Sequence, residues 1–352
     1  MGVDTDEVLA LYLETGSYQE TADRIGLGYE AVRKRVRRNL PPGSSTLFGA
    51  EGEQKLQWLR MPREALSTDE VASQVRQALF GYKPPKRLKT ALKGSADLLC
   101  LWPLPDLHVG MRAWGKETGG ADWDLAIANR VYRESMSELA LLTPMTKHAI
   151  ILVLGDLMHS DNYQYQTSNP STHHVVDQDG RYPKVLVAAT DICMYSVDIA
   201  LQRAETVEVV VLPGNHDGQS AIAIALALEM AFKSVKRVKV HMTPGRHWFF
   251  EFGSVMLAAT HGDKCKPKDM PGLMAACQPE MWGRTKHRIV FCGHLHHEEA
   301  KAYPGCKVET LAAPCPQDSW TAEMGYHSAR NLQTRIFHRE KGERFKQIVG
   351  IV

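Results

Sequence analysis

The chain has 352 residues, a formal net charge of +2 and a hydrophobic content of 44%. This length accommodates one large domain and a small one, and the near-neutral charge identifies no partner. The seven cysteines include no Cys-x-x-Cys pair, which argues against a disulfide framework or zinc ribbon and favours a reducing compartment. The first residues show no signal-peptide pattern, and no run approaches the roughly 20 apolar residues of a membrane span, so we expect a cytoplasmic protein.

The first residues, 1–41, predict a small all-α domain of three helices. Gly16 ends the first helix, and Ser17 is a suitable N-cap for a second helix over residues 18–25. A third helix is expected over residues 29–38.

The spacing of Ala22, the turn glycine Gly26 and Val32 is typical of a helix-turn-helix, and the unit resembles the DNA-binding domains of sigma factors and transposases. The third helix is basic, which favours contact with DNA phosphates through Arg33, Lys34, Arg35, Arg37 and Arg38. The alternative is a solvated helix whose basic residues favour its own carboxyl end. Arg35 lies where an apolar residue often packs, and Val36 is expected to substitute for it.

Residues 42–95 are expected to form a linker with one helix. The Pro-Pro-Gly-Ser-Ser run at 41–45 is typical of a linker, and Ser67 is a suitable cap for a helix that Gly81 ends. The basic stretch at 84–89 is compatible with a nucleic-acid contact or with a solvated linker.

Five short motifs in the rest of the chain each follow an apolar run that predicts a strand. The runs are 98–104, 150–154, 207–212, 255–259 and 289–292, and the motifs are Asp106-Leu107-His108, Gly155-Asp156, Gly214-Asn215-His216-Asp217, His261-Gly262-Asp263 and Gly293-His294-Leu295-His296. Buried strands that deliver polar residues from their carboxyl ends fit an α/β layered architecture.

The residue types in these motifs predict a site for two divalent metal ions. One residue separates Asp106 from His108, so a strand end places both side chains on one face, near one ion. Asp156 is the carboxylate best placed to bridge, because each of its oxygens can serve a different ion. An amide oxygen and further imidazoles add neutral donors, and two such ions suit hydrolysis of a phosphate ester.

Two residues of the third motif are candidates for proton transfer. His216 is expected to stand beside the metals and protonate the leaving oxygen. Asp217 follows directly and is expected to fix the tautomer of His216.

The order and composition of the motifs resemble the calcineurin-like metallophosphoesterase superfamily over roughly residues 96–352. The resemblance implies an α/β fold with a two-sheet sandwich flanked by helices. It also implies one metal bound by Asp106, His108, Asp156 and His296, a second bound by Asp156, Asn215, His261 and His294, and His216 as the catalytic acid or a phosphate-contacting histidine. Mn²⁺ is the expected ion, and Fe²⁺, Zn²⁺ and Mg²⁺ are also compatible with these donors.

Within that superfamily, three groups share longer runs with the chain. The sequence at 155–159 resembles the DNA-repair nuclease subunit of the double-strand-break complex, and the sequence at 106–110 resembles the exonuclease subunit of archaeal D-family polymerase. Longer stretches, including 261–267 and 293–297, resemble metallophosphoesterases of tailed phages and prophages, which bring no established substrate.

The irregular, polar stretch at 159–184 is expected to form a substrate-facing loop. His159 and Arg181 are its candidate substrate contacts, and Arg284 is a candidate phosphate contact near the last motif. A surface turn is an equally compatible interpretation for the region around Arg284.

Two classes of function remain open from the sequence. The first is a DNA nuclease or phosphodiesterase directed to DNA by the helix-turn-helix. The second is a phosphomonoesterase for a protein or small molecule, with the N-terminal domain used for localisation or regulation. A DNA-binding regulator with a vestigial metal site is disfavoured, because all the ligand types are present. DNA is the expected partner, and a homodimer is one of the compatible oligomeric states.

Overall fold

The computed structural model describes residues 5–15, 17–39, 44–48, 54–59, 94–169, 173–242 and 245–352. The chain divides into two compact units, Met1–Leu66 and Ser67–Val352. The predicted helix that begins at Ser67 and the basic stretch at 84–89 lie outside the described residues.

The first unit contains the three predicted helices, α1 (Thr5–Thr15), α2 (Tyr18–Ile25) and α3 (Tyr29–Asn39). The Ser17 side chain accepts a hydrogen bond from the main-chain N–H of Glu20 at 3.3 Å, which confirms it as the cap of α2. A small core holds the helices together and consists of Val8, Ala22, Val32 and Val36. Val36 therefore fills the apolar position beside Arg35, as expected.

A β-hairpin that the sequence did not predict follows α3. It pairs β1 (Ser44–Phe48) with β2 (Gln54–Leu59) in antiparallel register. Its first two residues, Ser44 and Ser45, belong to the run at 41–45 whose composition predicts a linker. Hydrogen bonding between strands decides this pairing, and turn-forming residue types alone do not reveal it.

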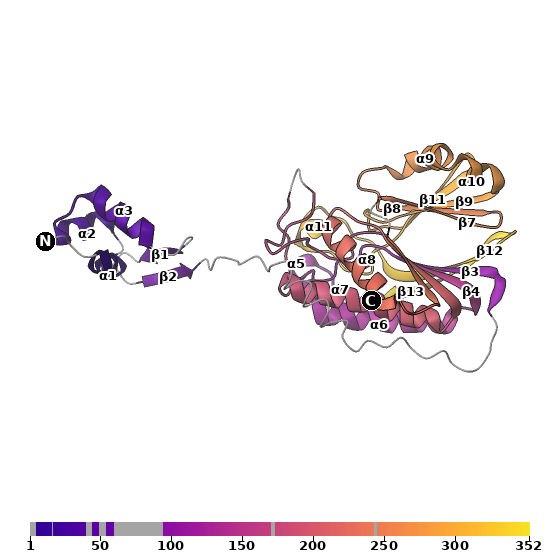
Figure 1. Cartoon of the computed structure of the whole chain (residues 1–352), viewed down its shortest axis with the longest axis horizontal. Coiled ribbons are helices and arrows are strands. Elements are labelled where there is room, and N and C mark those ends of the chain that lie inside the picture. Colours follow the sequence, from indigo (N-terminus) through magenta and orange to yellow (C-terminus); the bar gives the residue numbers. More distant parts are fainter. Residues whose placement is uncertain are drawn as a thin grey trace. The chain divides into compact units, whose positions relative to one another are not determined.

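The second unit contains two β-sheets with helices on their outer faces, which confirms the expected two-sheet α/β sandwich (Figure 1). The six-stranded sheet has the order β13-β12-β3-β4-β5-β6. Its strands are β3 (Ser95–Leu104), β4 (Thr146–Val153), β5 (Ala204–Val211), β6 (Val238–His241), β12 (Arg330–His338) and β13 (Gly342–Ile351). β3 to β6 run parallel, whereas β12 is antiparallel to both of its neighbours.

The five-stranded sheet has the order β10-β11-β9-β8-β7. Its strands are β7 (His247–Phe252), β8 (Val255–Thr260), β9 (His287–Cys292), β10 (Glu299–Tyr303) and β11 (Cys306–Thr310). β8, β9 and β11 are parallel. All five strands that the sequence predicted are present, as β3, β4, β5, β8 and β9.

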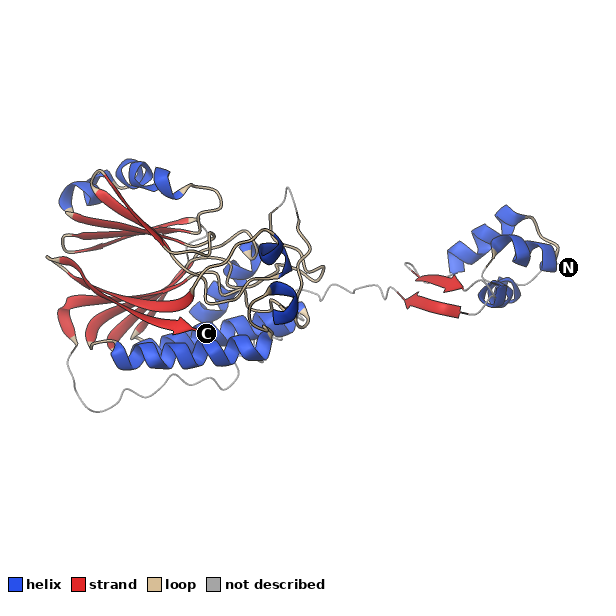
Figure 2. Ribbon diagram, turned by 180° about the vertical axis from the view of Figure 1, so that it is seen from behind, coloured by secondary structure: helices blue, strands red, loops and turns tan. Residues whose placement is uncertain are grey.

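Helices cover the outer face of each sheet (Figure 2). The six-stranded sheet packs against α6 (Leu125–Leu142), α7 (Tyr182–Leu201) and α8 (Gly218–Phe232). The five-stranded sheet packs against α9 (Met270–Cys277) and α10 (Pro279–Arg284), and the short helices α5 (Gly115–Thr118) and α11 (Ser319–Glu323) lie in loops.

Side chains on opposite faces of β3 show how the layers are built. Trp102 and Leu104 pack toward the helices, whereas Leu99 and Leu101 pack toward the other sheet. Both faces of the strand are thus buried, because successive side chains of a strand point to opposite sides. This explains why the strand has a continuous apolar run without alternation.

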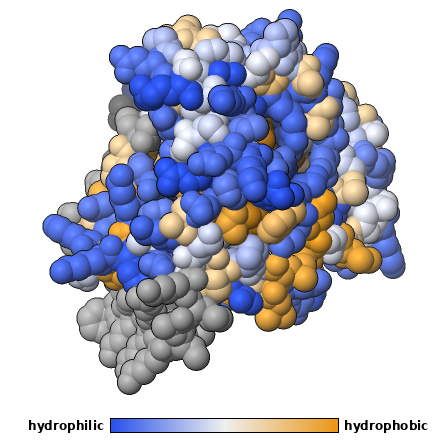
Figure 3. Space-filling model, turned by 90° about the vertical axis from the view of Figure 1, so that its right-hand side faces the viewer, coloured by the Kyte–Doolittle hydropathy of each residue, from blue (hydrophilic) through white to orange (hydrophobic). Residues whose placement is uncertain are grey.

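The face of the molecule in Figure 3 is mainly hydrophilic, with apolar residues gathered in a smaller area. Among the helices that the structure describes, none combines the length and the apolar character that crossing a membrane requires.

Candidate metal centre

The five motifs follow the carboxyl ends of β3, β4, β5, β8 and β9, and their side chains converge at one end of the sandwich. Parallel strands bring their carboxyl ends to the same edge of a sheet, so residues far apart in sequence meet there. The site opens into a cavity of about 800 Å³ lined by residues of the second unit.

One group of ligand atoms comes from Asp106, His108 and His296. Nε2 of His296 lies 3.1 Å from Nε2 of His108 and 3.6 Å from Oδ1 of Asp106. Asp106 is fully buried, and its two oxygens also accept the main-chain N–H of His294, both at 2.9 Å.

A second group comes from Asp156, His261 and His294. Nε2 of His261 lies 3.1 Å from Oδ2 of Asp156 and 2.9 Å from Oδ1 of Asn215. Oδ2 of Asp156 also lies 3.9 Å from Nε2 of His108. Asp156 therefore stands between the two groups, and the structure brings all seven predicted ligands together.

The second group requires a positive charge at its centre. Nδ1 of His261 donates a hydrogen bond to the Leu154 carbonyl at 2.8 Å, which leaves Nε2 facing two oxygen acceptors. Burial alone would lower the pKa of His261, but the carboxylates of Asp156 and Asp106 raise it to about 10. Either a proton or a metal ion supplies that charge. The oxygen and imidazole donors fit a divalent cation.

Two other histidines are kept neutral and can offer lone pairs. Burial and the neighbouring histidines hold the pKa of His108 well below its usual range. Burial, together with His261, also lowers the pKa of His294. A neutral imidazole is the form that binds a metal.

The main chain at the site is strained. Five of the candidate ligands have positive φ angles, namely Asp106 (45°), His108 (43°), Asp156 (50°), His294 (68°) and His296 (55°). Such a conformation costs on the order of 1–3 kcal/mol for a residue other than glycine, and it is found where function and surrounding contacts impose it.

Two glycines in the motifs make room for the carboxylates. A Cβ on Gly214 would lie 1.9 Å from Oδ1 of Asp156, and a Cβ on Gly293 would lie 2.6 Å from Oδ2 of Asp106. No side chain fits at either position without moving a candidate ligand.

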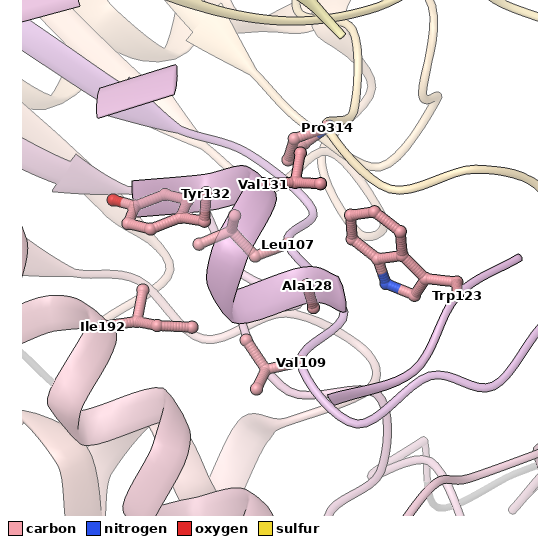
Figure 4. A pocket seen from close by; sticks show the side chains of 8 residues that line it. All are labelled: Leu107, Val109, Trp123, Ala128, Val131, Tyr132, Ile192 and Pro314. Atoms are coloured by element: carbon pink, nitrogen blue, oxygen red, sulfur yellow. The ribbon is translucent and has the colours of Figure 1, made fainter. Parts of the chain in front are cut away.

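In the loop after β3, apolar residues that pack into the protein alternate with the candidate metal ligands. Leu107 and Val109 line a small apolar pocket of about 10 Å³, together with Trp123 and Tyr132 among others (Figure 4). The close packing beneath the loop fixes the positions of Asp106 and His108 on its other side.

The structure gives His216 a different orienting partner from the one predicted. Nδ1 of His216 donates a hydrogen bond to the carbonyl of His159 at 2.8 Å, and its main-chain N–H donates to Oδ1 of Asp156 at 2.8 Å. The ring is partly exposed and lines the cavity. The carbonyl of His159 thus fixes the tautomer and leaves Nε2 available.

The role predicted for Asp217 is therefore wrong. Its fully buried carboxylate accepts hydrogen bonds from the main-chain N–H groups of Asp156, Gly214 and Met158 at 3.0–3.2 Å. Burial and the nearby charge of Asp156 raise the pKa of Asp217 to about 7. Asp217 holds two ligand loops together and does not touch the His216 ring.

His159 lies deeper than the sequence suggested. It is buried, with Nδ1 3.0 Å from Nδ1 of His108, and forms a third group of potential metal ligands with His108 and His216. Burial and the neighbouring His216 lower the pKa of His159 to about 3. His159 therefore belongs to the buried centre and also lines the cavity, so its predicted contact with substrate stays a prediction.

The polar stretch at 159–184, after β4, is predicted from the sequence to face the substrate, and part of it lines the cavity. Thr167 and His174 line the cavity, and Oγ of Ser168 donates a hydrogen bond to the carbonyl of Asn215 at 2.9 Å. Arg181, in contrast, precedes α7 as its N-cap, is exposed and does not line the cavity.

Arg284 is not at the site. It ends α10 on the outer side of the five-stranded sheet and forms an ion pair with Glu251 of β7 at 2.9 Å. The pairing of β7 with β8 places Glu251 beside α10, and spacing along the sequence does not reveal this contact.

One segment of the cavity wall has no signal in the sequence. Residues 315–321 and 325–328 line the cavity, including Asp318, Trp320 and Tyr326. They carry no motif, and an isolated aromatic residue in a sequence gives no signal for a binding site.

In the first unit, the basic residues of α3 have different surroundings. Arg33 pairs with Glu30 at 2.8 Å, Lys34 is exposed and Arg35 is partly exposed. The side chains of Arg37 and Arg38 lie outside the described part of the structure.

The second unit thus combines the architecture expected of a metallophosphoesterase sandwich with buried groups of histidine and aspartate that can hold metal ions. No protein-family model and no curated protein matches the chain.

Several solved structures align with part of the chain at low similarity. Wild-type Vps29 from Entamoeba histolytica, complexed with zinc, is 11% identical, with 72% of this chain and 98% of that chain covered and a TM-score of 0.30. A novel archaeal phosphodiesterase is 10% identical, with 72% and 99% covered and a TM-score of 0.31. A predicted phosphoesterase from Streptococcus pneumoniae is 9% identical, with 72% and 98% covered and a TM-score of 0.29. These values are too low to transfer an activity or a ligand.

Proposed function

We propose that this protein is a metal-dependent phosphoesterase that hydrolyses phosphodiester bonds in DNA. The observation that supports it best is that Nε2 of His261 faces two oxygen donors, Oδ1 of Asn215 at 2.9 Å and Oδ2 of Asp156 at 3.1 Å. A second cluster of ligand atoms, around His108 and His296, lies directly beside it.

The residues present fit two divalent ions, with Asp156 shared between them. Asp106, His108 and His296 would hold one ion, and Asn215, His261 and His294 the other. When bound, the ions supply positive charge to the phosphoryl oxygens and make a water molecule more acidic.

His216 is proposed to supply the proton for the leaving oxygen. Its Nδ1–H is held by the His159 carbonyl, so the transferable proton of the imidazolium form is on Nε2. The ring lies at the cavity surface, with its centroid 4.7 Å from that of His108. A leaving oxygen held at the first group is therefore within reach of the ring.

The first unit supports DNA as the substrate. Val32 and Val36 direct one face of α3 into its core, which leaves Lys34 exposed on the other face. Arg33 lies next to Lys34 on this helix, and the sequence adds Arg37 and Arg38. A basic helix face of this kind attracts the phosphates of DNA.

The proposal is tested with the full-length protein and Mn²⁺. Single-stranded DNA, duplex DNA, a small phosphodiester and a small phosphomonoester are compared, with EDTA as the control. Metal-dependent cleavage of DNA and of the diester, with little turnover of the monoester, is expected. Turnover of the monoester alone would replace the proposal with the phosphomonoesterase alternative.

A further inference from the structure

The cavity at the metal groups is much larger than a phosphate group requires. Its volume of about 800 Å³ is in the range of pockets that enclose drug-sized organic ligands, roughly 300–1,000 Å³. The wall contributed by residues 315–321 and 325–328 is remote in sequence from every metal motif except the last. This wall is available to recognise the part of the substrate beyond the phosphate.

Two aromatic side chains on that wall are exposed. Trp320 is 60% exposed and Tyr326 is 58% exposed, and their ring centroids are 6.2 Å apart with an interplanar angle of 45°. Large aromatic side chains that line a cavity and remain open to solvent offer apolar surface to a ligand. We call this pair the aromatic shelf.

Hydrogen bonds hold the aromatic shelf in place. Asp318 caps α11 by accepting the main-chain N–H of Thr321 at 2.8 Å, and Ser319 donates from Oγ to Asp177 at 2.9 Å. The main-chain N–H of Tyr326 donates to the Thr321 carbonyl at 3.0 Å, which fixes the chain between the two rings. The shelf is therefore positioned before any ligand arrives.

The same cavity also offers a cationic side chain. Lys264, three residues after the candidate ligand His261, is exposed and lines the cavity, and Lys266 and Lys268 are exposed in the same segment. Lysines of this kind attract the phosphates that flank a cleaved bond.

We propose that the aromatic shelf stacks an unpaired nucleobase of the substrate while the adjoining phosphodiester lies at the metal groups. This inference rests on the proposed function and narrows its substrate to single-stranded nucleic acid or an unpaired end. Aromatic rings stack on the flat face of any base and therefore carry little sequence preference. In an intact duplex both faces of a base are covered, so the shelf selects unpaired residues.

The test compares two short ligands that differ only in their bases. Thymidine tetranucleotide and an abasic tetranucleotide of the same length carry equal phosphate charge, and both are too short for extensive contact with α3. Binding to the full-length protein is measured in EDTA, where turnover is prevented, by filter binding and tryptophan fluorescence.

The wild-type protein is expected to bind the thymidine ligand on the order of 10-fold more tightly than the abasic one, as base stacking predicts. Trp320→Ala and Tyr326→Ala are expected to remove most of this preference. Trp320→Phe should keep the preference but lose fluorescence quenching. Phe345→Ala removes an aromatic side chain that is 44% exposed on β13 and lies outside the cavity lining, so it should behave as wild type.

Equal binding of the two ligands by wild type, or an unchanged preference in Trp320→Ala, would overturn the shelf. Hydrolysis with Mn²⁺ separates this failure from failure of the proposed function. If the shelf is right, Trp320→Ala raises KM for the thymidine ligand and removes most of the difference in KM between the thymidine and the abasic ligand. A base preference in binding without hydrolysis of either ligand leaves the shelf in place and refutes only the phosphodiesterase proposal.

Discussion

Oδ1 of Asp217 accepts a hydrogen bond from the main-chain N–H of Asp156 at 3.2 Å. The same carboxylate accepts the N–H groups of Gly214 and Met158. One buried side chain therefore connects the loop after β4 with the loop after β5, and each loop carries candidate ligands. The spacing between Asp156 and Asn215 depends on this connection.

Asp217→Ala is expected to destabilise the protein, because it leaves three buried N–H groups without their acceptor. One unsatisfied buried group costs about 1–3 kcal/mol, so a loss on the order of 3 kcal/mol or more is expected in urea unfolding of the metal-free protein. Asp177→Ala, at an exposed carboxylate of the cavity wall that accepts a hydrogen bond from Ser319, should cost much less and is the control. An unfolding midpoint unchanged by Asp217→Ala would show that this connection does not hold the loops.

Asp156→Asn is expected to lower the rate of hydrolysis by several orders of magnitude while the protein remains folded. The substitution removes the charge shared by the two groups but keeps the size of the side chain. Bound metal is counted by elemental analysis and kcat is measured with Mn²⁺. Asp177→Asn removes a carboxylate of the same cavity outside the metal groups and should retain both metals. Near wild-type turnover of Asp156→Asn would refute the two-metal site.

His216→Ala is expected to keep the metals and to lower turnover on the order of 10²–10⁴-fold, as loss of a general acid does. The decrease should be smaller for a nitrophenolate leaving group, which departs without a proton. Comparing kcat for good and poor leaving groups checks this. Equal decreases would assign His216 to positioning the phosphate.

Metal binding is expected to release a proton from His261. Because the pKa of His261 is raised to about 10 in the metal-free protein, the imidazole holds its second proton throughout neutral pH. A metal ion must displace that proton, so apparent affinity should rise by about tenfold per pH unit below that pKa.

The raised pKa of His261 also makes the stability of the metal-free protein depend on pH. The ion pair of His261 with Asp156 stabilises the metal-free protein fully below the usual histidine pKa, and this contribution is lost as pH rises through about 10.

For metal binding, calorimetry in buffers of different ionisation enthalpy measures the proton that His261 releases. Affinity that does not change between about pH 7 and pH 9 would contradict the displacement.

The basic helix α3 is expected to hold duplex DNA through several phosphates, so affinity should decrease steeply with salt. Replacing Arg33, Lys34, Arg37 and Arg38 together by alanine should weaken binding and reduce the salt dependence, while activity on a small phosphodiester is kept. Arg24→Ala, on α2 and paired with Glu14 and Glu20, is the control. Equal binding across a salt series by the fourfold variant and wild type would exclude α3 as the DNA contact.

Much of the site follows from the sequence, because short apolar runs predict buried strands and the polar residues after them meet at the strand ends. The sequence therefore predicts that Asp156 and His261 lie at the same metal ion, although it does not give the distance between them. The three helices of the first unit also follow, since the Ser17 cap and the buried pair Val32 and Val36 are local patterns.

Only the tertiary structure decided which groups contact each other across the motifs. Asp217 is adjacent to His216 in sequence, yet its carboxylate accepts the buried main-chain N–H groups of Asp156, Gly214 and Met158. Arg284 pairs with Glu251, since strand pairing brings β7 beside α10. Trp320 reaches the cavity through the return of the chain from the five-stranded sheet to β12. Periodicity and spacing describe neighbours along the chain, whereas these contacts depend on how the sheets pack.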